Sequence, residues 1–217
     1  MNSLVDSLHD ISDYVKYIMK LINRRDFTPQ SSMAYQDSPS PLSHHQTISA
    51  PHMHANALEY LRPLFQLDRP HILDVGSGSG YLTACLGVAC RVFETDHTIR
   101  GKVVGIDLFQ DLVDSSIQVI SRDYHLLTKY KRSFQIKQGD GKLGFPQKSH
   151  KELYDGIHIG AECTNVPPYL WHQLRKGGRM VLPLKLREGT YFCIILKTSD
   201  GDFSLIRKNR VRFVPLI

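Results

Sequence analysis

The hydrophobic pattern changes its period along the chain. In residues 2–23, apolar side chains recur three and four positions apart, which predicts one amphipathic helix. Residues 28–47 are rich in Ser, Gln, His and Pro and predict a loop, and loops of more than about 15 residues are usually functional or disordered. Short apolar runs then alternate with helical patterns from residue 54 onward. The chain therefore divides into a helical arm, a polar connector and a regular α/β body.

The body predicts strands that alternate with helices. The expected strands are 71–75, 102–106, 133–137, 154–159, 178–182, 191–197 and 211–216. The expected helices are 54–65, 81–89, 110–127 and 168–174. This order is typical of a doubly wound, mostly parallel sheet, with the last two strands antiparallel because only a short turn at Asp200–Gly201 joins them. We expect a single domain over 1–217, with arm and connector in 1–46 and the α/β core in 47–217.

The most informative segment joins the apolar strand 71–75 to a helix through Gly76, Gly78 and Gly80. Glycines at such a turn let the backbone approach a ligand closely. A dinucleotide fingerprint would place its third glycine one residue later, where Tyr81 stands. A Walker phosphate loop would need Gly-Lys-Ser/Thr, which is missing. The triplet alone leaves a bare turn and a ligand site equally open.

Carboxylates after the next two strands favour the ligand site. Asp107 ends the strand that starts at residue 102, and Asp140 follows the strand 133–137 within Gln138-Gly-Asp-Gly141. In a doubly wound fold, these positions lie beside the glycine turn at the carboxyl ends of the strands. Asp107 can accept both hydroxyls of an adenosine ribose, and Asp140 is placed to contact an adenine edge. We interpret the three signals together as a pocket for a nucleoside cofactor.

Two of these strings resemble motifs of the class I S-adenosylmethionine-dependent methyltransferases, which have a Rossmann-like fold: LDVGSGSG at 73–80 and VVGID at 103–107. Within that class, the chain resembles the protein-L-isoaspartate (D-aspartate) O-methyltransferase family. The resemblance is carried by Thr47-Ile-Ser-Ala-Pro-His-Met-His54, Tyr35-Gln-Asp-Ser-Pro39, YDGIHIGAE at 154–162 and LRKGGRMVLP at 174–183. It covers residues 33–183 well and the termini less well.

The resemblance implies a protein-repair enzyme. It implies transfer of a methyl group from S-adenosyl-L-methionine, which becomes S-adenosyl-L-homocysteine, to the free carboxylate of L-isoaspartyl residues in damaged proteins and peptides. Ser49 is similar to the active-site serine of the family, and Asp74 to the residue near the methionine end of the cofactor. The implied cofactor-binding residues are Gln46, Thr47, Ile48, Ser49, His54, Asp74, Gly76, Ser77, Gly78, Asp107, Leu108, Asp140 and Gly141.

The chemistry that this resemblance implies needs positioning more than acid–base catalysis. A carboxylate is already an adequate nucleophile at neutral pH, so its oxygen must be held in line with the methyl carbon and the sulfur. A serine hydroxyl such as Ser49 can hold the carboxylate by one directional hydrogen bond. No metal is required, and the histidines at 44, 45, 52 and 54 lack the further ligands with defined spacing of a metal site.

Three departures from the family pattern stand out. Leu42-Ser43-His44-His45 replaces the usual Ile-Gly before the TIS string. The sequence ends at Ile217, where the family commonly has a threonine, and this leads us to expect altered closure of the cofactor cleft. Ala161-Glu-Cys-Thr164 replaces an alanine-rich stretch, so peptide selection is expected to differ.

Composition adds limits on location and partners. An apolar fraction of 41%, no apolar run near the roughly 18 residues of a membrane span, and no signal-peptide stretch predict a cytoplasmic protein. The four cysteines include no CxxC pair and favour thiols over disulfides. The net charge of +6 is scattered, which favours solvated faces over a nucleic-acid footprint. We expect a monomer that acts on isoaspartyl proteins, without obligate nucleic acid or membrane.

Several alternatives stay open at this stage. A nucleic-acid methyltransferase of the same fold is disfavoured because the string His158-Ile-Gly-Ala-Glu162 stands where base methylation typically uses Asn/Asp-Pro-Pro-aromatic. A catalytically weak module that binds the cofactor or damaged protein is a second alternative. Ser49 would be an ordinary N-cap of a helix that begins near Met53, and Asp74 a turn cap. A structural role for His54 also stays open, and Trp171 is expected in the core.

Overall fold

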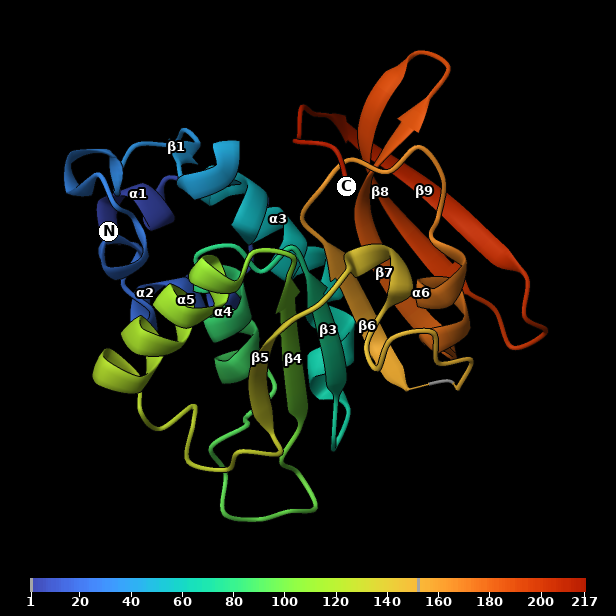
Figure 1. Ribbon diagram of the computed structural model, residues 1–217, viewed down its shortest axis with the longest axis horizontal. Helices are drawn as coiled ribbons and strands as arrows, with labels where there is room; N and C mark the ends of the chain where they lie inside the picture. The colour runs from blue at the N-terminus through green and yellow to red at the C-terminus, as the bar shows by residue number, and fades with distance from the viewer. Residues whose placement is uncertain (1, 152) are drawn as a thin grey trace.

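Figure 1 shows the computed structural model, which describes residues 2–151 and 153–217. Within these residues, one seven-stranded sheet has the strand order β5-β4-β3-β6-β7-β8-β9. The strands are β3 (His71–Val75), β4 (Lys102–Asp107), β5 (Phe134–Gln138), β6 (Tyr154–Ile159), β7 (Leu174–Leu186), β8 (Gly189–Lys197) and β9 (Phe203–Arg210). Strands β3 to β7 are parallel, and β8 and β9 add antiparallel. The doubly wound, mostly parallel sheet is confirmed.

Helices cover both faces of this sheet. They are α1 (Asn2–Asp6), α2 (Asp13–Leu21), α3 (Pro51–Leu61), α4 (Tyr81–Ala89), α5 (Gln110–Asp123) and α6 (Pro168–Gln173). In Figure 1, strands β3 to β6 stand between α4 and α5 on one side and α6 on the other. Side chains of β3 point alternately into two cores, Ile72 toward α2 to α5, and Leu73 and Val75 toward α6. Because both faces are covered, β3 is buried almost throughout, and its buried residues are apolar except Asp74.

The N-terminal arm differs from the single helix expected over 2–23. The chain breaks between α1 and α2 at Asp10, which has a left-handed φ of 57°. Ser12 then starts α2 as its N-cap, because its hydroxyl oxygen accepts the amide proton of Val15. The amide and hydroxyl of Ser12 also donate to Glu59 of α3, at 3.0 and 2.6 Å. The break therefore anchors the arm to the body.

The connector is also more structured than the loop expected over 28–47. Two short strands, β1 (Ser40–Pro41) and β2 (Thr47–Ile48), pair antiparallel. The 3-10 turns η2 (Ser31–Met33) and η3 (Ser43–His45) lie in the same range, and η1 (Arg24–Phe27) directly precedes it. The expectation failed because these elements are only two to four residues long, below the length at which periodicity is readable.

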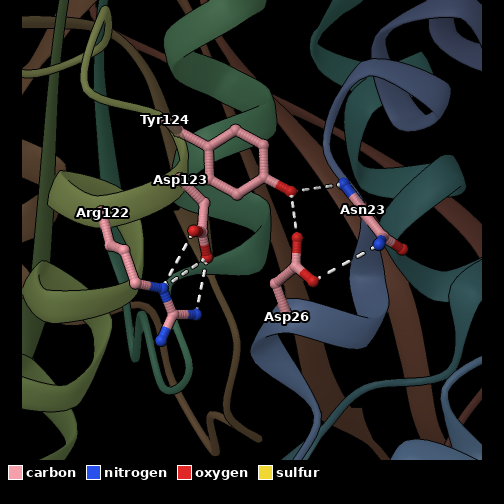
Figure 2. Close-up of polar contacts among 5 residues, drawn as sticks. All are labelled: Asn23, Asp26, Arg122, Asp123 and Tyr124. Atoms are coloured by element: carbon pink, nitrogen blue, oxygen red, sulfur yellow. Dashed lines mark hydrogen bonds and ion pairs between the residues drawn. The ribbon is translucent and has the colours of Figure 1, made fainter.

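A hydrogen-bonded group ties the start of the connector to the end of α5 (Figure 2). The phenol of Tyr124 donates to the Asp26 carboxylate at 2.6 Å and accepts the backbone N–H of Asn23 at 2.8 Å. The amide side chain of Asn23 donates to the other oxygen of Asp26 at 3.3 Å. The Tyr124 ring also stacks on Phe27. Segments about 100 residues apart in the sequence are thus held side by side.

The C-terminal strand predicted at 211–216 is wrong, because these residues form no strand of the sheet. The last strand is β9, which starts shortly after the turn at Asp200–Gly201 and pairs antiparallel with β8, as Lys197 opposite Phe203 shows. All of β9 is exposed, so it lacks the apolar alternation that would have revealed it, and its basic residues are typical of an edge strand. The final residues instead return to the body, where Glu162 exchanges backbone hydrogen bonds with Val214 and Leu216.

Smaller differences concern element ends. The helix expected at 54–65 begins three residues earlier, with Pro51 at its first turn, and continues after Leu61 as the 3-10 helix η4 (Arg62–Gln66). Trp171, expected in the core, is only partly buried against the α6 side and meets Phe203 edge to face.

Candidate functional site

The glycine turn lies between β3 and α4 and is bound to β4. The backbone N–H groups of Gly76 and Ser77 both donate to the Ile106 carbonyl, at 2.8 and 3.0 Å. Gly80 has a φ of +84°, and a Cβ there would lie 2.8 Å from the Cβ of Ser116 in α5. A side chain at this position would therefore separate α5 from the turn. The glycines shape a turn that is packed between three elements.

The Asp107 carboxylate lies directly beside this turn, at the end of β4. It is 7% exposed and accepts the N–H of Gly78 at 2.8 Å on one oxygen and the N–H of Phe109 at 3.1 Å on the other. Burial raises its pKa, although the bonds from the two amides oppose that effect. Each oxygen keeps a second lone pair for a further donor. Leu108, the next residue, is exposed.

Asp74 is the most deeply placed acid of the site. Its two oxygens accept the Thr83 hydroxyl at 2.5 Å and pair with Nδ1 of His158 at 2.8 Å. Strands β3 and β6 bring Asp74 and His158 into register, and α4 contributes Thr83. Asp74 is therefore not a turn cap. Its carboxylate joins β3 to β6 and α4, and within the described ranges it accepts no hydrogen bond from the backbone of the glycine turn.

A small cavity of about 40 Å³ lies between the glycine turn and the TIS string. Eight of the residues predicted from the sequence line it: Thr47, Ile48, Ser49, His54, Asp74, Gly76, Ser77 and Gly78. The buried hydroxyl of Ser77 has no hydrogen-bond partner among the described residues. The cavity therefore presents at least one polar group that a ligand can satisfy.

The remaining predicted residues lie outside this cavity. Asp107 ends β4, Leu108 follows it, and Gln46 precedes β2. The Asp140 carboxylate caps a short turn by accepting the N–H of Lys142 at 2.8 Å. Gly141 packs on Val75 and Leu216. These positions follow the carboxyl ends of β4 and β5, along one edge of the sheet.

Ser49 stands where the small cavity meets a larger, open one. The larger cavity has a volume of about 520 Å³ and is lined by residues on either side of Ser49 and by the chain segment 210–214. Ser49 and Thr47 line both cavities. The N-cap interpretation of Ser49 is wrong, because α3 begins at Pro51 and its N-cap position is Ala50.

His54 faces the cavity from the first turn of α3, and Arg24 lies behind it. Nη1 of the fully buried Arg24 is 3.2 Å from Nδ1 of His54. Burial and the positive charge of Arg24 hold the pKa of His54 well below its usual value, so the imidazole is neutral at neutral pH. Since the guanidinium only donates, Nδ1 accepts and the imidazole proton is on Nε2.

Sequence reasoning missed three contributors to this site: Arg24, Tyr81 and His158. Tyr81, just after the glycine turn, lines the cavity and lies 5.0 Å from the His54 ring, centroid to centroid. His158 carried a signal, since it lies one residue before the end of β6, the strand that pairs with β3. Arg24 carried none, because a basic residue beside a polar connector is typical of an exposed position.

The departure at 42–45 has a clear structural role. The Ser43 hydroxyl and Nε2 of His44 bond the two oxygens of Asp111, at 2.9 and 2.8 Å. The His44 ring also stacks on Phe109 with centroids 4.1 Å apart. These contacts bind the connector to the first turn of α5. Leu42 is thereby held beside the glycine turn, where a Cβ at Gly78 would lie 3.4 Å from its side chain.

Other features narrow the chemistry. All four cysteines are buried free thiols, as expected. Among the described residues, no three His, Cys, Asp or Glu side chains gather as a metal site would require. No helix of the described ranges has the length and apolar character to cross a membrane.

Comparisons with known proteins agree with this geometry. The family model for protein-L-isoaspartate (D-aspartate) O-methyltransferase matches residues 1–217. The chain is 39% identical to a protein-L-isoaspartate O-methyltransferase of Triticum aestivum, over 99% of this chain and 90% of that protein. It is 36% identical to one of Caenorhabditis elegans, over 91% and 82%.

A solved structure extends the comparison to the fold. A protein-L-isoaspartate O-methyltransferase of Plasmodium falciparum, in complex with S-adenosyl-L-homocysteine, superposes with a TM-score of 0.88. The two sequences are 31% identical, and the match covers 100% of this chain and 97% of the other. With its glycine turn, its TIS string and these relatives over nearly full length, the chain belongs to the protein-L-isoaspartate (D-aspartate) O-methyltransferase family.

Proposed function

We propose that this protein transfers a methyl group from S-adenosyl-L-methionine to the free carboxylate of L-isoaspartyl residues in damaged proteins and peptides. The observation that carries the proposal is the position of Ser49 between two cavities. The small one adjoins the glycine turn and suits the cofactor, and the open one suits a peptide. Family membership and the likeness to a homologue solved with S-adenosyl-L-homocysteine support the same assignment.

The residues around the glycine turn fit the cofactor. The unpartnered hydroxyl of Ser77 and the free lone pairs of Asp107 are suited to polar groups of a nucleoside. A volume of about 40 Å³ is too small for a whole nucleoside cofactor. We therefore infer that only the methionine end occupies the small cavity. The ribose and adenine then extend along the strand ends toward Asp107 and Asp140.

Each residue has an inferred role in that arrangement. Gly76, Ser77 and Gly78, in the glycine turn, hold the methionine end. Asp74 orients this side of the cavity through its bonds to Thr83 and His158. Asp107 accepts the ribose hydroxyls, with Leu108 beside it. Asp140 and Gly141 contact the adenine. The opposite wall consists of the remaining predicted residues, Gln46, Thr47, Ile48, Ser49 and His54.

The methyl transfer then depends on positioning by this chain. When bound, the cofactor supplies an electrophilic methyl group on a positively charged sulfur. Ser49 donates its hydroxyl hydrogen to one oxygen of the incoming carboxylate and leaves the other free to attack. The substrate carboxylate is ionised at neutral pH, so no residue has to remove a proton. Neutral His54 and buried Tyr81 close the far side of the cavity and exclude water.

A matched pair of peptides tests the proposal. We expect the protein to move radiolabelled methyl from S-adenosyl-L-methionine to a peptide with one isoaspartyl residue, and not to its normal aspartyl twin. Single-stranded RNA is expected to stay unlabelled. Equal labelling of both peptides would refute the repair function. Cofactor binding without transfer to either peptide would indicate a binding module instead.

We further infer that the protein is a cytoplasmic monomer of one domain. Four free, buried thiols support a reducing compartment. Sedimentation at micromolar concentration is expected to give the mass of one chain, and a mass of two chains would contradict the inference.

A further inference from the structure

Another cavity lies at the amino edge of the sheet, far from the glycine turn in the fold. Its volume is about 380 Å³, and it is lined by Arg69, His71, Arg100, Lys102 and Arg175. All five are basic residue types. The cavity lies where β3 and β4 begin, whereas the candidate active site lies where they end. In Figure 1, the loop before β4 runs in green below the sheet, and this edge faces it.

The fold presses the two main basic segments together. His71 and Lys102 are register partners in the parallel pair β3–β4. The N–H of Lys102 donates to the Pro70 carbonyl at 2.8 Å, and that of Gly101 to the Cys90 carbonyl at 2.9 Å. A Cβ at Gly101 would lie 2.5 and 2.6 Å from these two carbonyl oxygens, so only glycine permits this approach. Residues 69–71 and 100–102 are thereby fixed side by side.

Asp155, the acid beside Arg175, already has its partners. Arg175 pairs with one oxygen of Asp155 at 2.7 Å, and the other oxygen accepts the N–H of His71 at 2.8 Å. Three positive charges, on Arg69, Arg100 and Lys102, therefore line one cavity whose lining includes no acid. Within the described ranges none of the three forms an ion pair, although hydrogen bonds from Thr98 and, to a lesser degree, the charge of Arg100 lower the pKa of the Asp96 carboxyl.

The positions of two side chains are set before any ligand arrives. The guanidinium of Arg100 lies 3.8 Å above the Tyr130 ring and donates to the Glu94 carbonyl at 3.0 Å. Arg175 is held by Asp155. Burial, together with Lys102 and Arg175, lowers the pKa of His71 to about 4, so its ring is a neutral hydrogen-bonding group at neutral pH. Such a fixed, positively charged pocket favours anions with several oxygens.

We propose that this cavity binds the di- or triphosphate group of a small ligand. Arginine forks and a lysine match phosphate oxygens by charge-assisted hydrogen bonds. The volume lies within the range of small-ligand pockets, roughly 300–1,000 Å³. A nucleic acid would instead need a basic stripe along the surface. The site goes beyond the proposed methyl transfer, because no residue of the candidate active site contributes to it.

Calorimetry with sodium tripolyphosphate on the whole protein tests the proposal. The variant Arg69→Gln/Lys102→Gln removes two exposed side chains that hold no ion pair within the described ranges, so the fold is expected to persist. Its affinity for tripolyphosphate should fall at least about tenfold, because two charge-assisted bonds are lost. The control Arg187→Gln/Lys208→Gln removes the same net charge elsewhere and should keep wild-type affinity.

Further arms identify the source of the phosphate. Binding of ATP but not of adenosine, or of free tripolyphosphate alone, would each support the site and distinguish a nucleotide from the free anion. No binding by the wild type, or equal weakening in both double variants, would overturn the proposal. Tighter binding of a single-stranded oligonucleotide, weakened in both variants alike, would also overturn it. S-adenosyl-L-homocysteine affinity, measured alongside, should be unchanged in all variants and shows that they are folded.

Discussion

The amino edge and the carboxyl edge of the central sheet, where its parallel strands begin and end, differ in the sign of their charge. At the carboxyl edge, Asp74 lines one cavity with neutral His54, Asp107 lies beside the glycine turn, and protein donors already satisfy part of each carboxylate. At the amino edge, Arg69, Arg100 and Lys102 share a cavity without a free acid. Strand β3 is only five residues long, so about 15 Å separates the two environments. One edge is organised by its own hydrogen bonds, whereas the other leaves charge for a ligand.

The largest expected effect is on the stability of the protein as the pH falls, and it comes from His71 at the amino edge. Burial holds the His71 pKa of the folded protein at about 4, against a usual value of 6.5, and Lys102 and Arg175 add to this effect while Asp155 opposes it. As pH falls below 6.5, the unfolded chain therefore binds this proton first, and stability declines until about pH 4. The difference of 2.5 in pKa corresponds to about 3 kcal/mol.

His71→Gln should remove that part of the pH dependence. Urea unfolding at pH 7 and pH 4.5 measures it, with ligand-free protein. The exposed His125→Gln variant is the control and should follow the wild type. If His71→Gln and wild type lose equal free energy of unfolding over this interval, the buried neutral state of His71 is wrong.

The next prediction concerns the carboxyl edge. Asp107→Ala should weaken binding of S-adenosyl-L-homocysteine by about 2–3 kcal/mol, because two hydrogen bonds to a charged acceptor are lost. Calorimetry measures the affinity. Asp114→Ala removes an exposed carboxylate of α5 and should leave the affinity unchanged. An unchanged affinity in folded Asp107→Ala would disprove the ribose assignment.

The smallest expected effect concerns Ser49, between the two cavities. Ser49→Ala should slow single-turnover methyl transfer roughly ten- to a hundred-fold, or about 1.5–3 kcal/mol, because one bond to the carboxylate is lost. Stability and cofactor affinity should hardly change, because Ala50 and not Ser49 stands at the N-cap of α3. Ser32→Ala, in the connector, should behave as wild type. A loss of stability with unchanged turnover would assign Ser49 to the scaffold.

Sequence reasoning predicted the carboxyl edge far better than the amino edge. The glycine turn and Asp107 are readable because each lies in a contiguous string whose spacing reflects a strand end. The amino-edge cavity joins Arg69, Arg100 and Arg175, which only strand register brings together. Along the sequence, these residues are far apart and belong to a scattered net charge that favours solvated faces. Which residues of neighbouring strands become partners depends on how the strands align in the folded sheet, and the string around one such residue does not show it.

The same reason explains the errors at both ends of the chain. Strand β9 is a fully exposed edge strand, whereas the more apolar segment 211–216 is a tail that docks on Glu162. In the arm, the helical spacing of apolar residues continues across Asp10. The bonds of Ser12 to Glu59 nevertheless start a second helix, α2, just after it. In each case a contact distant in sequence overrode the local preference.

Helix α5 acts as a spacer for the connector. Tyr124, just after its last turn, holds Asn23 and Asp26, and Asp111, in its first turn, holds Ser43 and His44. A rigid helix keeps the two attachment points about 20 Å apart. The chain between Asp26 and Ser43 is thus attached to α5 at both ends. Strand β2 begins shortly after His44, and Ser49 follows β2. Because α5 also packs on the glycine turn, the helix fixes the position of Ser49 relative to that turn.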